Sequence, residues 1–93
     1  MELTELPNIG PELSRLLREA GISTGEELRA AGAEEAFLRL LARDPSACFH
    51  KLTALEGAAE GVRKTQLSPE RKTELRAFFQ RAKGSAPAGN KIR

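Results

Sequence analysis

Apolar residues in this chain recur at helical spacing, in short segments that glycine and proline interrupt. Residues 11–20 show this clearly, because their apolar side chains fall at i, i+3, i+4 and i+7 and share one helix face: Leu13, Leu16, Leu17 and Ala20. No stretch alternates apolar and polar residues for long enough to indicate a strand. β-branched and aromatic residues are also scarce, with three Ile, one Val, four Phe and no Trp or Tyr. The pattern therefore predicts an all-α fold.

Boundary signals divide the chain into about five short helices. We expect these over the following residues: 11–20, 25–31, 33–43, 45–59 and 69–83. The short connections and the absence of a sustained heptad predict a compact orthogonal array and exclude a coiled coil. Residues 1–83 then form one small domain. The final segment, 84–93 (GSAPAGNKIR), is small and polar, so we expect a disordered C-terminal tail.

Three of these helix starts have a clear chemical basis. Thr24 is followed by glutamate three residues later, which is the spacing of a capping box. Ser68 precedes Pro69, so the hydroxyl serves as N-cap and the proline as first helical residue. Asp44 precedes Pro45 in the same way, and we expect the fourth helix to begin there.

The single cysteine and the single histidine do not form a catalytic pair. Cys48 and His50 are two residues apart on a predicted helix, where side chains do not face each other. We expect Cys48 to be a small buried hydrophobe and His50 to lie on or near the surface. One cysteine permits neither an internal disulfide nor a cysteine-based zinc site, and it favours a reducing, cytoplasmic setting.

Other catalytic and membrane signals are also missing from the sequence. There is no nucleotide-binding loop and no metal-ligand spacing. We therefore predict no catalytic, cofactor or metal site, no small-molecule substrate, and a protein that is not an enzyme. The N-terminus (MELTELPNIG) carries two acids and no apolar run, and no apolar stretch is long enough to span a membrane.

Charge is distributed unevenly along the chain, although the formal net charge is only +2. Residues 1–60 carry 6 basic and 11 acidic residues, whereas residues 61–93 carry 9 basic and 2 acidic ones. Helical spacing places three cations on one stripe of the last helix: Lys72, Arg76 and Lys83. Four more flank it: Arg63, Lys64, Lys91 and Arg93. This basic stripe has two possible roles. It contacts a phosphate backbone or an acidic protein surface, or it is a solvated helix face whose positive charge partly neutralises the acidic N-terminal half.

The segment LPNIGPELSRLLREAGI resembles a helix-hairpin-helix element, and the motifs around it extend the resemblance along most of the chain. The motifs are Asn8-Ile9-Gly10-Pro11, Ala20-Gly21-Ile22-x-Thr24, Glu27-Leu28-Arg29, Gly32-Ala33, Leu52-x-x-Leu55-Glu56-Gly57-Ala58 and Leu67-Ser68-Pro69-Glu70-Arg71-Lys72. Together they resemble the C-terminal domain of TfoX/Sxy proteins. The resemblance implies a SAM-like helical fold and a bacterial role in DNA transformation competence and its transcriptional control. Full-length relatives carry a further N-terminal domain, for which this chain has no room, so it looks like a stand-alone C-terminal domain.

The hairpin-like turn is a candidate phosphate site under this resemblance. The backbone N–H groups of such a turn and the following helix bind a DNA phosphate, because they are unsatisfied and lie at the positive end of the helix dipole. The residues concerned are Asn8, Ile9, Gly10, Glu12 and Leu13. The alternative is a purely structural turn that packs Ile9 under the first helix, since the Glu12 carboxylate would repel a phosphate.

The resulting functional expectation is a regulatory interaction module with a protein partner. The alternative is direct duplex DNA binding through the turn and the basic stripe, without sequence specificity. Stacking on single-stranded nucleic acid is disfavoured, because all four Phe fall within apolar stripes.

Overall fold

The computed structural model describes residues 1–84, and these are helical with no strand. The elements are η1 (Leu3–Glu5), α1 (Pro11–Glu19), α2 (Gly25–Arg43), α3 (Phe49–Glu60), η2 (Lys64–Gln66) and α4 (Pro69–Gly84), where η denotes a 3-10 helix. The predicted all-α fold is confirmed. Gly84, placed in the tail by the sequence pattern, is instead the last residue of α4. The rest of the predicted tail, residues 85–93, lies outside the described residues.

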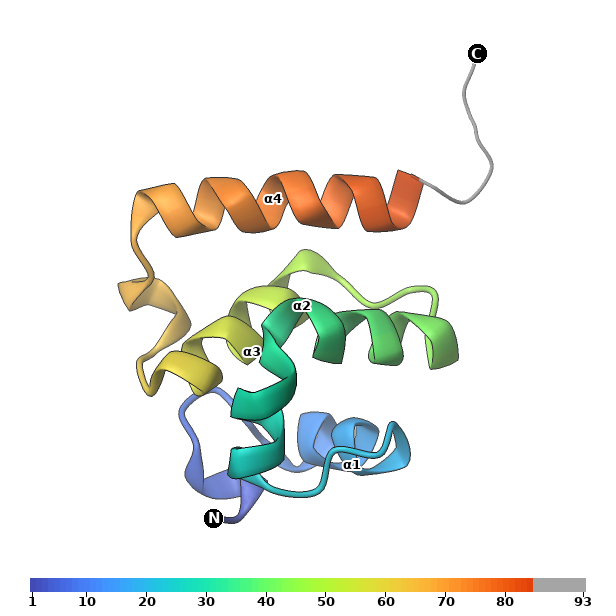
Figure 1. Cartoon of the computed structure of the whole chain (residues 1–93), viewed down its shortest axis with the longest axis vertical. Coiled ribbons are helices and arrows are strands. Elements are labelled where there is room, and N and C mark those ends of the chain that lie inside the picture. The colour runs from blue at the N-terminus through green and yellow to red at the C-terminus, as the bar shows by residue number, and fades with distance from the viewer. Residues whose placement is uncertain (85–93) are drawn as a thin grey trace.

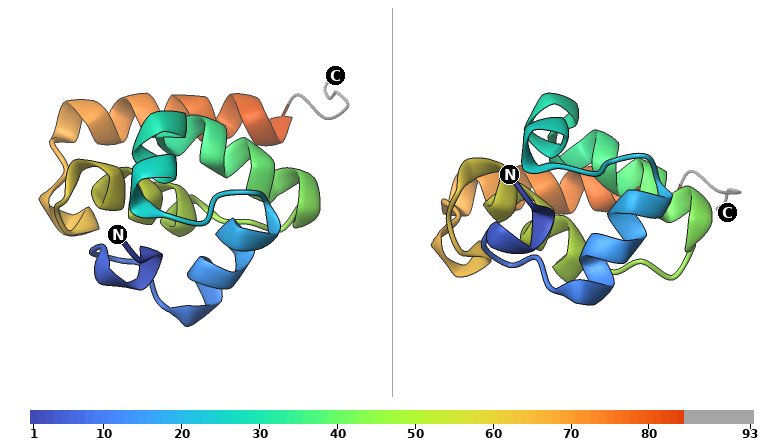
Figure 2. Two further views of the ribbon diagram at one scale, coloured as in Figure 1. Left: turned by 60° about the horizontal axis from the view of Figure 1, so that its bottom comes forward. Right: turned by 90° about the horizontal axis from the view of Figure 1, so that it is seen from below.

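Helices α2 and α3 pack against each other in the middle of the molecule, with the other elements on two sides (Figure 1). Helix α4 runs across one side of this pair, and η1 and α1 lie on the opposite side (Figure 2). The core between them is almost entirely aliphatic. Phe37 of α2 is its largest fully buried side chain, and its ring meets those of Phe78 and Phe79 at centroid distances of 6.5 and 5.8 Å. Aromatic contacts therefore hold α4 onto α2.

Helix α2 contains the break that the sequence predicts at Gly32. This glycine has φ 83° and ψ 158°, so the two arms of α2 correspond to the predicted helices over 25–31 and 33–43. The expected count of five helices differs from the observed four because the arms join across this kink. A positive φ is readily adopted only by glycine. Gly32 therefore sets the angle between the two arms.

The predicted start of the fourth helix at Pro45 is wrong. Asp44 is the C-cap of α2, and its carboxylate accepts hydrogen bonds from the Ser46 N–H (3.1 Å) and hydroxyl (2.6 Å). The chain then turns, buries Ala47 and begins α3 at Phe49. Asp44 thus forms a side-chain turn in place of a helix cap, because Ala47 must enter the core before the helix can start.

The other two predicted helix starts are confirmed. The Thr24 hydroxyl accepts from the Glu27 N–H at 3.1 Å, and the Glu27 carboxylate accepts from the Thr24 N–H at 3.2 Å. The Ser68 hydroxyl accepts from the Arg71 N–H at 3.0 Å. The connection between α3 and α4 contains the single turn η2. None of the helices found over residues 1–84 is long and apolar enough to cross a membrane.

Candidate functional site

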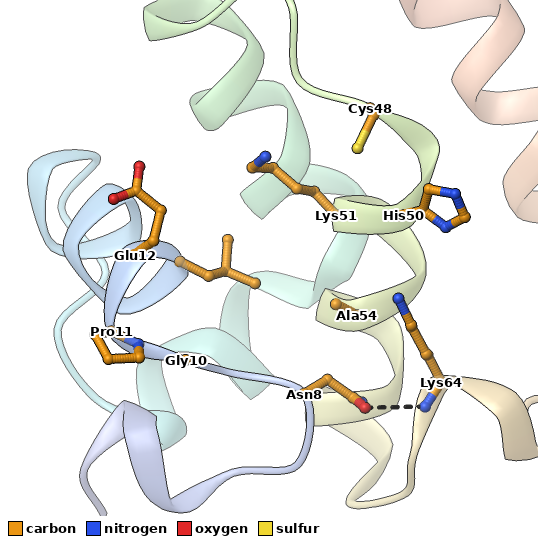
Figure 3. Close-up of a pocket in the computed structure, with 10 residues that line it drawn as sticks. Asn8, Gly10, Pro11, Glu12, Cys48, His50, Lys51, Ala54 and Lys64 are labelled. Atoms are coloured by element: carbon orange, nitrogen blue, oxygen red, sulfur yellow. Dashed lines mark hydrogen bonds between the residues drawn. The ribbon is translucent and has the colours of Figure 1, made fainter.

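One side chain fastens the hairpin-like turn to the segment that follows the C-terminal end of α3. The Asn8 amide donates to the carbonyl oxygen of Val62 at 3.0 Å and accepts from the N–H of Lys64 at 3.1 Å (Figure 3). Asn8 has φ 71°, a conformation that asparagine tolerates better than most residues. The side chain passes so close to Gly57 that a Cβ atom there would lie 2.5 Å from the Asn8 amide nitrogen. Asn8 is therefore a structural fastener.

The start of α1 presents free N–H groups beside this fastener. Gly10 is the N-cap and offers no side-chain cap. In the described part of the chain, no acceptor is found for the N–H groups of Gly10, Glu12 and Leu13. Ile9 differs from them, since its side chain is buried and its N–H points to the Leu6 carbonyl at 3.4 Å. The turn thus combines a buried anchor with three available donors.

A hollow of about 370 Å³ lies between this turn and the first turn of α3. Lys51 and His50 of α3 and Lys64 of η2 line it opposite Gly10 and Glu12 (Figure 3). Lys51 and His50 are absent from the predicted binding residues. The sequence alone does not indicate that these two residues belong to a binding site, because only the packing of α1 against α3 brings them to the turn.

A second hollow, of about 310 Å³, shares the lining residues His50 and Lys64 with the first. It is lined by residues of α3, η2 and α4: Phe49, His50, Thr53, Lys64, Thr65, Lys72 and Arg76. We name the cations of the two hollows, Lys51, Lys64, Lys72 and Arg76, the basic face. The Arg76 guanidinium carbon lies 4.5 Å from the centre of the Phe49 ring, so a cation–π contact orients it.

The structure divides the predicted basic stripe. Lys72 and Arg76 line the second hollow, but the Lys83 ammonium donates to the carbonyl oxygens of Pro45 and Ala47. Lys83 therefore closes the turn that precedes α3. Arg63 is exposed and lines neither hollow. Lys91 and Arg93 lie outside the described residues.

Some cations outside the basic face are held in ion pairs, whereas others, Arg18, Arg29, Arg63, Arg81 and Lys83, form none within residues 1–84. Arg15, Arg39 and Arg43 each pair with glutamates of α1 or α2, and Arg71 pairs with three carboxylates. Within residues 1–84, no side chain of the basic face forms an ion pair. Glu12, at the edge of the first hollow, is held by Arg15 at 2.7 Å. The four cations are therefore left to meet an external anion.

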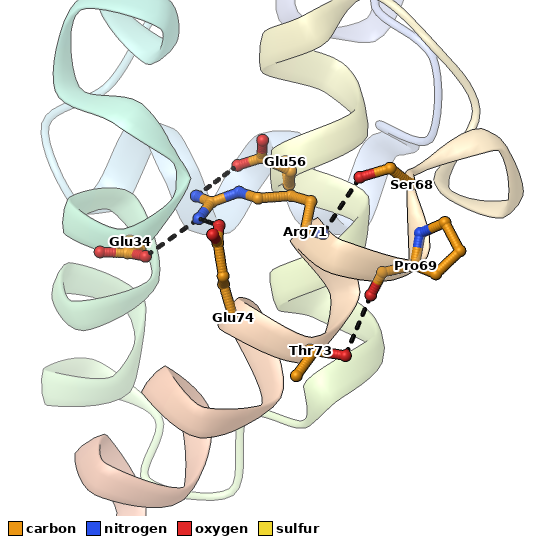
Figure 4. A network of polar contacts seen from close by, with 7 residues as sticks. All are labelled: Glu34, Glu56, Ser68, Pro69, Arg71, Thr73 and Glu74. Carbon is orange, nitrogen blue, oxygen red and sulfur yellow. Dashed lines mark hydrogen bonds and ion pairs between the residues drawn. The ribbon is translucent and has the colours of Figure 1, made fainter.

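Arg71 holds α4 in place through carboxylates from three helices (Figure 4). Its guanidinium lies 3.0 Å from Glu56 of α3, 3.0 Å from Glu74 of α4 and 3.5 Å from Glu34 of α2. Burial is the largest single effect and acts to raise the pKa of Glu56, but the hydrogen bonds with Arg71 and Glu60 and the charge of Arg71 together lower that pKa. The same bonds raise the pKa of Arg71. This network fixes the helix that supplies Lys72 and Arg76.

Cys48 is exposed, so the predicted buried position is wrong. It is the N-cap of α3 and lines the first hollow, because the helix begins one residue after it. Burial acts to raise the pKa of the thiol, but the nearby N–H groups of Lys51 and His50 outweigh it and lower that pKa. His50 is exposed, as predicted. Within the described residues, no three His, Cys, Asp or Glu side chains are grouped to hold a metal ion.

Comparison with known proteins identifies the family. The model of the TfoX C-terminal domain matches residues 1–79. A crystal structure of an uncharacterized protein from Listeria monocytogenes, in a triclinic form, is 46% identical with a TM-score of 0.89, over 90% of this chain and 96% of that one. A tetragonal crystal form of a Listeria monocytogenes protein of unknown function is 47% identical with a TM-score of 0.84, over 85% and 98%. No curated protein matches the chain. The chain belongs to the TfoX C-terminal domain family.

Proposed function

We propose that the chain is a non-enzymatic regulatory module that acts in the cytoplasm in the control of DNA transformation competence. It binds an acidic segment of a protein partner through the basic face. Membership of the TfoX C-terminal domain family supports the competence setting. The observation that carries the binding role is the set of four cations, none in an ion pair within residues 1–84, around two hollows that share His50 and Lys64.

Electrostatics favours this surface over the rest of the molecule. Elsewhere, three of the five arginines of residues 1–60 form internal ion pairs, such as Arg15 with Glu12 and Glu19. Opposite charges on two proteins steer their encounter and fix their orientation, while exposed pairs add little affinity each. A partner with several closely spaced carboxylates would gain from all four cations together.

Duplex DNA is the second candidate for the same face, and one observation favours it. The unpaired N–H groups of Gly10, Glu12 and Leu13 lie at the start of α1, across the first hollow from Lys51. A helix N-terminus with free N–H donors is a favourable binding site for a phosphate. DNA would then contact the turn and the cations of α4 at once.

Salt dependence separates the two candidates. We would titrate the full chain with random-sequence duplex DNA and with a polyglutamate peptide, measuring fluorescence anisotropy at low and moderate salt. DNA held by all four cations should give a slope of log affinity against log salt of roughly −3 to −4. Absence of DNA binding at low salt eliminates the DNA candidate, and absence of peptide binding counts against the acidic-partner candidate.

A pair of charge-matched variants tests the surface itself. Lys64→Glu with Lys72→Glu reverses two cations of the basic face. Arg63→Glu with Arg81→Glu makes the same change of net charge at two exposed cations that line neither basic hollow. The first pair should abolish binding of whichever ligand binds, and the second should weaken it only slightly. Equal loss in both would show that net charge, and not this surface, governs binding.

A further inference from the structure

We infer that the hollow between α3, η2 and α4 is a binding site for a phosphate monoester dianion. The inference rests on the proposed function, since it names the group that the basic face binds most tightly. Three cations from two elements converge there, Lys64 from η2 and Lys72 and Arg76 from α4. Its volume of about 310 Å³ is enough for a phosphate and the group that carries it.

The lining of this hollow is suited to an anion with several oxygens. Among the residues described, no carboxylate lines it, and His50 adds a ring nitrogen. The Thr65 hydroxyl has no hydrogen-bond partner among the residues described, so it is free to donate to a phosphate oxygen. Thr53 is already committed, because its hydroxyl donates to the His50 carbonyl at 3.0 Å. The cavity therefore offers point charges and a hydroxyl to a single oxyanion.

Arg76 is oriented by an aromatic contact without any ligand. Its guanidinium rests on the Phe49 ring, and that ring packs edge-on against Phe79 with centroids 5.6 Å apart. A guanidinium held in this way loses little freedom when it binds, and its planar fork matches two phosphate oxygens. Lys64 and Lys72 then supply flexible charges from the sides.

The concentration of charge favours a dianion over a backbone phosphodiester. A phosphodiester carries one charge, and a nucleic acid spreads its charges along a line. Here three cations surround one small space, so a group with nearly two negative charges and three acceptor oxygens uses them best. Such a group occurs on a phosphorylated side chain of a partner or on a free phosphorylated small molecule.

The test compares two ligands that differ only in charge and one methyl group. The full chain is titrated with methyl phosphate and with dimethyl phosphate, above the second pKa of the monoester, and amide chemical shifts of Lys64, Thr65 and Lys72 are followed by NMR. The monoester should bind at least about fivefold more tightly, the factor that one further charge about 4 Å from a cation supplies even in bulk water. Equal affinity for the two, or shifts confined to other residues, overturns the inference.

Two variants and a peptide complete the experiment. Lys72→Gln should weaken methyl phosphate binding roughly tenfold, the effect of losing one charged hydrogen bond, whereas the α4 control Arg81→Gln should leave it unchanged. An unchanged affinity in Lys72→Gln, with its circular dichroism unaltered, would overturn the inference. A phosphoserine peptide that binds more tightly than methyl phosphate identifies a protein source, and equal affinity identifies a small molecule.

These outcomes are separate from those of the proposed function. Polyglutamate or duplex DNA binding without any methyl phosphate binding would retain the proposed function and remove the dianion site. Methyl phosphate binding without either macromolecular probe would retain the dianion site and remove the interaction surfaces proposed above.

Discussion

Removing the guanidinium of Arg71 should destabilise the protein more than removing any other side chain that forms an ion pair within residues 1–84. Arg71→Ala leaves Glu56, whose side chain is only 11% exposed, without its 3.0 Å partner. A hydrogen bond between charged groups contributes about 1.5–3 kcal/mol. The side chains of Glu74 and Glu34 are 65% and 44% exposed, so each of their ion pairs with Arg71 adds at most about 1 kcal/mol.

The free energy of unfolding should therefore fall by about 2–4 kcal/mol in Arg71→Ala. For a domain of this size each kcal/mol lowers the melting temperature by roughly 4–8 °C, so the expected drop is roughly 10–30 °C. Urea unfolding followed by circular dichroism gives the free energy, and thermal unfolding gives the midpoint.

Two companion variants make this prediction specific. Glu74→Ala removes only the exposed pair and should cost less than about 1 kcal/mol. Adding Glu56→Gln to Arg71→Ala should recover part of the loss, because a neutral amide is cheaper to leave unpaired than a carboxylate. The reasoning is refuted if Arg71→Ala loses no more stability than Glu74→Ala does.

Four further changes probe the backbone, the caps and the charges. Gly57→Ala should destabilise by about 1–2 kcal/mol in urea unfolding, since the new methyl would meet Asn8 and a backbone carbonyl at 2.5–2.7 Å and this overpacking exceeds the gain in helix propensity; a stabilised variant would contradict this. Gly32→Ala should cost about 1–3 kcal/mol through its backbone conformation alone (φ 83°, ψ 158°), because no described atom lies within 4 Å of the new Cβ, and unaltered stability would refute this reasoning. Thr24→Ala should cost about 1 kcal/mol, with Thr24→Ser as the control that keeps the cap. Because the pKa of Glu56 is lowered in the folded state, its ionised carboxylate stabilises the fold at pH values above the ordinary glutamate pKa, and this stability is lost as the pH falls through the lowered pKa. The difference in unfolding free energy between wild type and Glu56→Gln should therefore shrink from neutral pH to about pH 3. A difference that stays constant over this range would contradict the prediction.

Local signals in the sequence predicted the helices well because local chemistry decides them. The capping box at Thr24 and the N-cap at Ser68 depend on side chains three residues away, and both form. Gly32 breaks its helix as expected.

Features that depend on distant partners escaped prediction. Asp44 resembles an N-cap locally, but burial of Ala47 delays the helix by four residues and thereby exposes Cys48. Gly57 makes room for Asn8, a residue far away in the chain, and no local pattern indicates this.

The same limitation applies to the candidate site. Helical spacing correctly put Lys72 and Arg76 together, but it could not show that Lys83 bonds to carbonyls of the preceding loop. Nor could it show that Lys51 faces the turn at Gly10. Those relations depend on how α1 and α4 pack on α3, and no short-range pattern encodes them.

The Asn8 fastener also has a kinetic consequence. Its two hydrogen bonds join residues 54 and 56 positions apart, so they close the largest loop of any side-chain contact described above. Closing such a loop costs chain entropy, so we expect these two hydrogen bonds to form after the folding transition state. Asn8→Ala should therefore speed unfolding while leaving the refolding rate almost unchanged. The hollow between α1 and α3 is then among the last parts to assemble, and a partly folded chain would offer its cations without the turn that faces them.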